Sequence, residues 1–493
     1  MTKRPTQTPR RPPPPSDRIH TGITGLDNVL HGGLIRGSSI LVEGKAGVGK
    51  STLGLQFLVS GAIEHGERGI LLSFDVEPSK LYRYAMNLGW DLKQLESEGT
   101  LRIIMASAQT ALDQLQKERS PLDRVLKEMN PSRLVIDSVT LLRDLIPDRA
   151  TLRKMVKVLL NSAAREGLTP MLIAETIGSD PESGIVERSA VDAIFSLSAE
   201  LYEGREYELR RLRVVKARGQ SFVTGNHTYR IRDRHGIELY PRVASAPESK
   251  PINHVSTERD SFGIPALDQM LGGGTYPGTA TMVAGSTGTG KSLLGLQYIL
   301  AGIQAGQRAL IINMEETPEQ IIRNARVLNF ELEPLIDSGL LRVMYADPAE
   351  VDLNQHLGWV MDDVRARGVR RILIDSVTNY AVIAPNESQF KDSLFSLVSF
   401  LKSTGVSSLF TSEISELIGA PRVTDQTVSV FVDAIMLLQY VKTGQALSRR
   451  LLVLKTRGSD HAKDFRTYTI EPGGFRLAEP DIEVAGAPSL AFR

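Results

Sequence analysis

The sequence contains no cysteine, and aromatic residues occupy only 6% of its 493 positions. The lack of cysteine excludes disulfide scaffolds, thiolate zinc sites, iron–sulfur clusters and cysteine nucleophiles. No apolar run reaches the roughly 18 residues that a membrane-spanning helix requires. The first residues also lack the apolar stretch of a secretory signal. We therefore expect a cytoplasmic protein that does not engage a membrane.

The chain also lacks a surplus of either charge, since 58 basic residues stand against 57 acidic ones. Proteins that wrap around nucleic acid usually carry a basic excess, so this balance weakly disfavours such a role. At about 150 residues per domain, the length predicts two to four domains.

The sequence contains two copies of one pattern. The segment LLSFDVEP at 71–78 matches IINMEETP at 311–318, and LVIDSVT at 134–140 matches ILIDSVT at 372–378. Matched positions lie 238 to 241 residues apart, which indicates a tandem duplication of one domain. The predicted order is a disordered proline-rich tail, domain 1, a linker, domain 2 and a C-terminal tail, with the bounds 1–16, 17–243, 244–257, 258–477 and 478–493.

Within each copy, short apolar runs alternate with longer segments of helical periodicity. Runs such as 39–43, 69–74 and 133–136 are bounded by Gly, Pro or Asp and are too short for helices. This alternation is typical of a mainly parallel sheet with helices on both faces. After residue 191 the strand-like runs follow one another closely, which predicts an antiparallel edge. The predicted fold class is α/β.

Each copy contains the phosphate-binding pattern GxxxxGK followed by Ser, at 44–51 and at 285–292. The glycines let backbone N–H groups converge on phosphates, the lysine neutralises their charge and the serine hydroxyl ligates Mg²⁺. We predict that both copies bind ATP with Mg²⁺. The predicted ATP-binding residues are Gly44, Gly47, Val48, Gly49, Lys50, Ser51 and Thr52 in the first copy and Gly285, Gly288, Thr289, Gly290, Lys291 and Ser292 in the second.

Asp137 and Asp375 each end an apolar strand in the sequence IDSVT. A carboxylate at this position of a P-loop domain holds Mg²⁺ through its water shell. With the P-loop hydroxyls, the predicted metal-site residues are Ser51, Asp137, Ser292 and Asp375.

The two copies differ where a catalytic base is expected. Phosphoryl transfer needs a group that takes a proton from the nucleophile or orients it beside the γ-phosphate. In the second copy Glu315 and Glu316 follow the second strand, whereas the first copy has Asp75 and Val76. Aspartate is shorter by one methylene and valine takes no proton. We expect the second site to turn ATP over and the first to bind it and hydrolyse it weakly.

A second basic cluster ends a strand far downstream of each P-loop, as Lys216 and Arg218 and as Lys455 and Arg457. Because each P-loop already has its own lysine, we expect these cations to reach the γ-phosphate of a neighbouring subunit, as an arginine finger does. The alternative is an ordinary basic strand end. The trans arrangement requires a closed ring of subunits, and two upstream arginines join the candidates: Arg210 and Arg449.

Taken together, these residues resemble the KaiC family, the tandem RecA-like P-loop ATPases named after the cyanobacterial clock protein. The resemblance covers residues 17–477 and is carried by both P-loops, the Glu315-Glu316 pair, TGITGLDNVLHGGL at 21–34 and KTRGSDHAK at 455–463. It implies two RecA-like domains in a homohexameric double ring with ATP at the subunit interfaces. It also implies slow ATP hydrolysis in the first ring, and serine/threonine autokinase and autophosphatase activity in the second.

For individual residues, the resemblance implies that Glu316 or Glu315 serves as the base. It further implies contacts with the neighbour's ATP from Lys455, Arg457, His461 and Lys463.

This chain departs from the family pattern in three places. Asp75-Val76 replaces paired glutamates, and Phe222 and Thr224 stand where the family has His and Lys. The family's adjacent Ser-Thr phosphorylation pair aligns with Ser429-Val430, so one hydroxyl is missing. An ordered two-site cycle is therefore not expected. The candidate phosphorylation sites are Ser429, Thr424 and Thr427.

Two other functions stay open at this point. One is a RecA/RadA-type ATPase that acts on single-stranded DNA, but the loops at 175–190 and 413–427 carry more acid than base and no aromatic residue. The other is a scaffold that ATP holds together without kinase activity. We favour a signalling or regulatory ATPase with protein partners and without nucleic acid.

Overall fold

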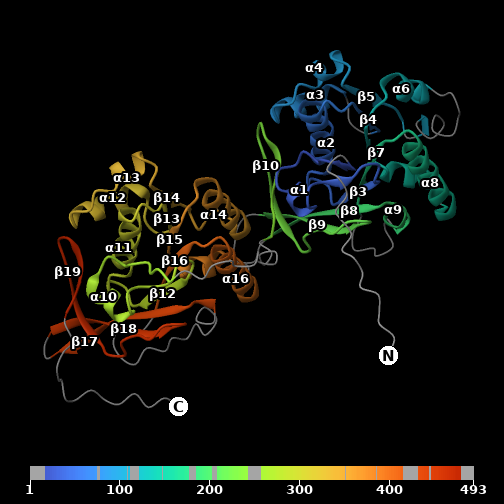
Figure 1. Ribbon diagram of the computed structural model, residues 1–493. Helices are drawn as coiled ribbons and strands as arrows, with labels where there is room; N and C mark the ends of the chain where they lie inside the picture. Colours follow the sequence, from blue (N-terminus) through green and yellow to red (C-terminus); the bar gives the residue numbers. More distant parts are fainter. Residues whose placement is uncertain are drawn as a thin grey trace, which may run out of the picture. The chain divides into compact units, whose positions relative to one another are not determined.

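The computed structural model describes residues 17–74, 78–107, 109–110, 121–146, 148–176, 185–201, 208–242, 257–349, 351–384, 386–414, 431–443 and 446–478. The chain divides into two compact units, 1–242 and 243–493, which we call domain 1 and domain 2. Each domain contains one nine-stranded sheet (Figure 1).

The sheet of domain 1 has the strand order β5-β4-β6-β7-β3-β8-β9-β10-β11. Neighbours from β5 to β8 are parallel and those from β8 to β11 are antiparallel. The bounds are β3 Ile40–Gly44, β4 Gly69–Ser73, β5 Leu101–Met105, β6 Arg133–Asp137, β7 Thr169–Glu175, β8 Ala193–Leu201, β9 Glu208–Ala217, β10 His227–Arg232 and β11 Gly236–Tyr240, with a separate pair of β1 Arg18–Ile19 and β2 Leu34–Ile35.

The sheet of domain 2 repeats this topology as β14-β13-β15-β16-β12-β17-β18-β19-β20. Its neighbours are parallel from β14 to β17 and antiparallel from there to β20. The predicted α/β class and its antiparallel edge are thus confirmed. The bounds are β12 Ala280–Gly285, β13 Ala309–Asn313, β14 Leu341–Tyr345, β15 Arg371–Asp375, β16 Ser407–Glu413, β17 Ala434–Thr443, β18 Ala446–Thr456, β19 Arg466–Glu471 and β20 Gly474–Leu477.

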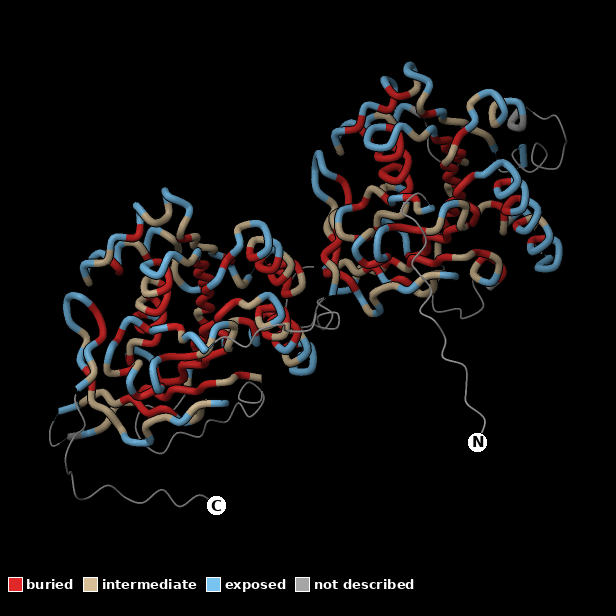
Figure 2. The backbone as a smooth tube through the Cα atoms, viewed as in Figure 1, coloured by how far each residue is buried: buried red, intermediate tan, exposed pale blue. Residues whose placement is uncertain are grey.

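Helices cover both faces of each sheet, so the central strands are buried (Figure 2). On β6, for example, Leu134, Val135 and Ile136 are all buried, as expected for a parallel strand between two helical layers. The helices of domain 1 are α1 Leu26–Val29, α2 Lys50–His65, α3 Pro78–Asn87, α4 Leu92–Ser97, α6 Pro121–Met129, α7 Thr140–Leu145, α8 Arg149–Arg165 and α9 Ile185–Ala190. Those of domain 2 are α10 Pro265–Met270, α11 Lys291–Gln304, α12 Pro318–Val327, α13 Glu333–Asp337, α14 Leu353–Arg367, α15 Val377–Ile383 and α16 Glu387–Ser403.

In the described part of each domain one arginine is buried at the start of the strand that ends in the predicted metal-binding aspartate, Arg133 on β6 and Arg371 on β15. In domain 2 the Arg371 guanidinium donates to the Tyr298 carbonyl at 2.8 Å and lies 3.3 Å from a carboxylate oxygen of Asp260. A side chain at Gly302 would place its Cβ 2.3 Å from Arg371 Cδ, which explains a glycine inside α11. The arginine therefore ties α11 to the start of β15.

We predict that Arg371→Met destabilises the protein by about 3–5 kcal/mol, because it leaves the buried Asp260 carboxylate without its counter-ion. Urea denaturation measures the loss. The matched control, Arg370→Met at the exposed neighbouring position, should change stability by no more than about 0.5 kcal/mol. Equal midpoints for the two variants would contradict the role given to Arg371.

Candidate functional site

The parallel strands of each domain end at one edge of the sheet, and their register decides which side chains meet there. In domain 2 Gly285 pairs with Glu413, and Asn313 pairs with Asp375. The P-loop therefore begins beside the acid that ends β16. In open α/β sheets this carboxyl edge is where ligands bind.

In each domain, a glycine in the left-handed region of backbone conformation joins the P-loop to the helix that follows it. Gly49 and Gly290 each have φ of 97° directly before α2 and α11. A Cβ at Gly290 would also lie 2.7 Å from Ile470 Cδ1. The Tyr468 hydroxyl donates to the Thr289 carbonyl at 2.6 Å, and the Tyr229 hydroxyl of domain 1 contacts Val48 in the same way. The antiparallel strands thus hold the P-loop in shape.

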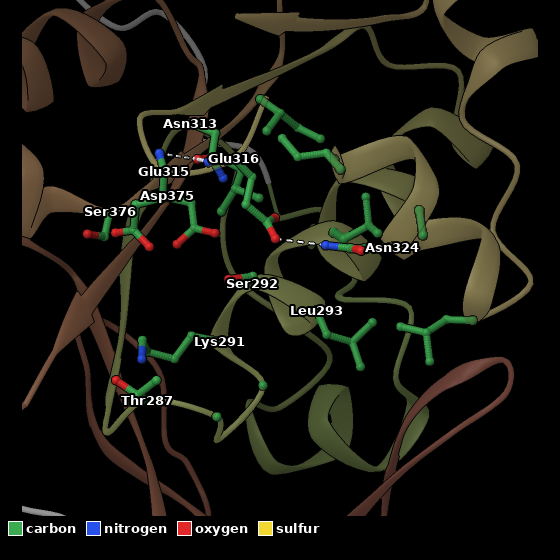
Figure 3. A pocket seen from close by; sticks show the side chains of 18 of the residues that line it. Thr287, Lys291, Ser292, Leu293, Asn313, Glu315, Glu316, Asn324, Asp375 and Ser376 are labelled. Atoms are coloured by element: carbon green, nitrogen blue, oxygen red, sulfur yellow. Dashed lines mark hydrogen bonds between the residues drawn. The ribbon is translucent and has the colours of Figure 1, made fainter. Parts of the chain in front are cut away.

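A cavity of about 380 Å³ opens over this edge in domain 2 (Figure 3). Lys291 and Thr287 of the P-loop lie at one end, and Glu315 and Glu316, which follow β13, lie with Asp375 of β15 at the other. The predicted residues among its lining are Gly288, Gly290, Lys291, Ser292, Glu315, Glu316 and Asp375. The structure thus brings most of the predicted phosphate, metal and catalytic residues of domain 2 into one cavity, while the predicted Gly285 and Thr289 are not among its lining residues.

Three asparagines that sequence reasoning missed hold the two glutamates. The Asn313 side chain accepts from the backbone N–H groups of Glu315 and Glu316 at 2.7 and 2.8 Å. Asn379 donates to the Glu315 carboxylate at 2.9 Å, and Asn324 donates to that of Glu316 at 2.7 Å. Asn324 of α12 and Asn379 of α15 lie 8 and 64 residues along the chain from the glutamates they contact, so no contiguous motif identifies them.

The Glu316 carboxylate has an altered proton affinity. Burial, and then the nearby carboxylate of Asp375, raise the pKa of Glu316 above the usual glutamate value, whereas the Asn324 hydrogen bond lowers it. A raised pKa makes this carboxylate a better proton acceptor near neutral pH. Glu316 is therefore suited to act as a general base.

The residues predicted for Mg²⁺ in domain 2 fit that ion. The Ser292 hydroxyl and the Asp375 carboxylate both line the cavity, and the Thr411 hydroxyl donates to Asp375. Mg²⁺ takes hard oxygen ligands and usually combines one or two carboxylates with phosphate oxygens and water. Ser292 and Asp375 would hold it, and it would neutralise phosphate charge.

The matches to known proteins extend over both domains. The family model for the ATPase KaiC matches residues 19–244 and 261–481. The chain belongs to the KaiC family of ATPases. The circadian clock protein KaiC3 of Synechocystis sp. is 30% identical over 480 residues, which are 95% of this chain and 93% of that protein. The circadian clock oscillator protein KaiC of Synechococcus elongatus is 31% identical over 476 residues, 94% of this chain and 89% of that protein.

The resemblance drawn from the motifs is thereby confirmed. Membership in the KaiC family makes the chain a P-loop ATPase that binds ATP, built from two tandem RecA-like domains. Within the described part of the chain, every helix is too short or too polar to cross a membrane.

Domain 1 of this KaiC-family chain has the same P-loop, but different side chains surround it. Gly44 ends β3, while Lys50, Ser51 and Thr52 open α2. Burial lowers the pKa of Lys50, and the carboxylates of Glu175 and Asp137 oppose that shift. Asp137 ends β6 as predicted for a metal ligand. Asp75, the weaker catalytic candidate, lies outside the described residues, as do Ser429, Thr424 and Thr427.

The cations predicted to act in trans end the antiparallel strands. Lys216 donates to the Arg188 carbonyl at 2.7 Å, and Lys455 donates to the Val432 carbonyl at 3.1 Å. The Arg218 and Arg457 side chains stay 56% and 53% exposed beside aspartates. Among the described lining residues of the domain 2 cavity there is none of the trans candidates of that domain.

The four remaining candidates lie as follows. Arg449 lies over the Tyr440 ring, 5.5 Å from its centroid, and the Tyr440 hydroxyl contacts Gly288 of the P-loop. Arg210 borders a surface hollow with Arg230 and Arg232. On the loop after β18, His461 is half-buried and Lys463 is exposed.

We predict that Asn324→Ala moves the acid side of the pH profile for ATP turnover by domain 2 to higher pH. The Asn324 hydrogen bond lowers the pKa of Glu316, so its loss raises that pKa, and a base works only when unprotonated. Turnover against pH, measured in a Lys50→Ala background, tests this. Arg326→Ala changes an exposed residue on the same helix as Asn324 and removes only its ion pair with Glu333 of α13, so it should keep the parent profile. A coincident profile for Asn324→Ala would count against Glu316 as the base.

Proposed function

We propose that the chain assembles into a homohexamer with ATP between subunits and that domain 2 transfers the γ-phosphate of ATP to a hydroxyl of its own chain. In this proposal domain 1 binds ATP mainly for assembly and hydrolyses it weakly. The protein is a regulatory autokinase and autophosphatase that signals to protein partners. The observation that carries it is the pair Glu315 and Glu316, held by asparagines across one cavity from Lys291.

In the proposed phosphoryl transfer, the residues of the cavity account for the proton and for the charge on the phosphates. The acceptor hydroxyl oxygen bonds to the γ-phosphorus while the bond from phosphorus to the β,γ-bridging oxygen breaks, and ADP leaves. The hydroxyl proton passes to the carboxylate of Glu316 or Glu315. The ammonium of Lys291 balances the charge of the phosphates during this step. Ser429 is the first candidate acceptor, with Thr424 and Thr427 as the others.

The exposed cations support a site completed by a neighbour. Arg457 and Lys463 extend from the antiparallel edge of domain 2 and are absent from the lining of its own cavity. A cation that enters from an adjacent subunit would stabilise the charge on the γ-phosphate, as an arginine finger does. Domain 1 carries fewer such groups, because Phe222 and Thr224 occupy the positions that correspond to His461 and Lys463.

We expect ATP to convert the protein to hexamers, because nucleotide phosphates would bridge the P-loop of one subunit and the cations of the next. Native mass spectrometry with and without ATP measures the change. Lys291→Ala should still assemble through domain 1, whereas Lys50→Ala should require more ATP. Monomers at saturating ATP would contradict the ring.

Incubation with γ-labelled ATP, followed by phosphopeptide mapping, tests the kinase proposal. Label should appear at Ser429, Thr424 or Thr427, and Lys291→Ala should abolish it. Glu316→Gln should slow labelling by about 10²–10⁴-fold, the usual contribution of a general base. Glu319→Gln, at an exposed position of α12 outside the cavity, is the matched control and should label normally.

Release of free phosphate without label on the protein would contradict the kinase proposal and leave ATP hydrolysis as the activity. Turnover that rises with single-stranded DNA would favour the RecA/RadA-type function instead.

A further inference from the structure

Glu413, which ends β16, brings a negative charge to the lysine that has to bind phosphate in domain 2. Its Oε1 lies 3.7 Å from the Lys291 ammonium and accepts a hydrogen bond from the Thr287 hydroxyl at 3.0 Å. Both partners belong to the P-loop, and all three residues line the cavity. The Lys291 side chain is 8% exposed and that of Glu413 is 46% exposed. Glu413 has no part in the phosphoryl transfer proposed for Glu315 and Glu316.

The position of Glu413 is set by the backbone as well as by the side chain. β16 pairs with β12 so that Glu413 lies opposite Gly285, the first P-loop residue. The Glu413 N–H donates to the hydroxyl of Thr378, the last residue of the IDSVT segment, at 3.3 Å. The Thr287 hydroxyl then fixes the carboxylate itself.

Domain 1 has the corresponding acid without the same anchor. Glu175 lies opposite Gly44, and its N–H donates to the Thr140 hydroxyl at 2.8 Å. The residue that corresponds to Thr287 is Ala46, which has no hydroxyl to hold a carboxylate. Both lysines donate to a P-loop carbonyl, Lys291 to Ser286 at 3.1 Å and Lys50 to Lys45 at 2.7 Å. Among the described residues, Lys291 in addition forms an ion pair within 4.0 Å with Glu413, whereas Glu175 acts on the charge of Lys50 without an ion pair at that distance.

A carboxylate and a γ-phosphate that contact the same ammonium stand only a few ångströms apart. Their repulsion is appreciable in a partly desolvated cavity. The P-loop lysine reaches the β- and γ-phosphates, so ATP brings more negative charge to this place than ADP does.

We propose that Glu413 is a specificity-determining residue that weakens the binding of ATP to domain 2 more than the binding of ADP. The inference rests on the proposed use of ATP by domain 2. Domain 1, which has Ala46 in place of Thr287, should discriminate less between ATP and ADP.

The test measures equilibrium binding of fluorescent ADP and of a fluorescent β,γ-imido analogue of ATP to the full chain in a Lys50→Ala background. Glu413→Gln should tighten binding of the ATP analogue by about fivefold or more, and that of ADP by less than about twofold. Thr287→Ala should act in the same direction with a smaller effect. The gain from Glu413→Gln should shrink as salt is raised, because salt screens partly exposed charges.

The matched control is Glu175→Gln in a Lys291→Ala background, which should change the preference of domain 1 less than Glu413→Gln changes that of domain 2. Glu413→Ala removes the charge in a second way and should agree with Glu413→Gln. An unchanged preference in both Glu413 variants would overturn the proposal. Weaker binding of the ATP analogue would also overturn it, because Glu413 would then position Lys291. Binding is measured without phosphate transfer, so a failure of the kinase proposal would be seen separately as missing protein label.

Discussion

One constraint underlies the site: parallel strands in register bring their carboxyl ends, and the charges carried there, to a single edge of the sheet. In domain 2 the register places Glu413 beside the P-loop strand, and Asp375 beside the strand that leads to the glutamates. Lys291 is the cation of the P-loop that faces these acids. The competition of carboxylates and phosphates for one lysine therefore follows directly from the topology.

The same constraint explains why two similar domains can act differently without a change of fold. Both sheets have the same strand order, and both P-loops are held by a tyrosine from the antiparallel edge. The differences lie in single side chains at strand ends, such as Ala46 against Thr287. A change there alters charge and hydrogen bonding at the phosphates, while the buried strands and the buried arginines Arg133 and Arg371 remain as they are.

The residues that the sequence predicted well are those whose neighbours in space are also neighbours in the chain. A P-loop is contiguous, so its pattern identifies Gly290, Lys291 and Ser292 directly. The IDSVT strand ends are nearly as clear, because an acid after an apolar run lies at the edge of a parallel sheet. The amides of Asn324 and Asn379 could not be found in this way, since they reach the glutamates from two different helices.

The sequence by itself determined the duplication, the α/β fold class, both phosphate cradles and the family, because each of these is written in short contiguous patterns. The tertiary structure alone decided that burial and Asp375 raise the pKa of Glu316, and that Glu413 faces Lys291. Those properties depend on charges that come from separate strands, and their separation is set by strand register and burial, which no local pattern encodes.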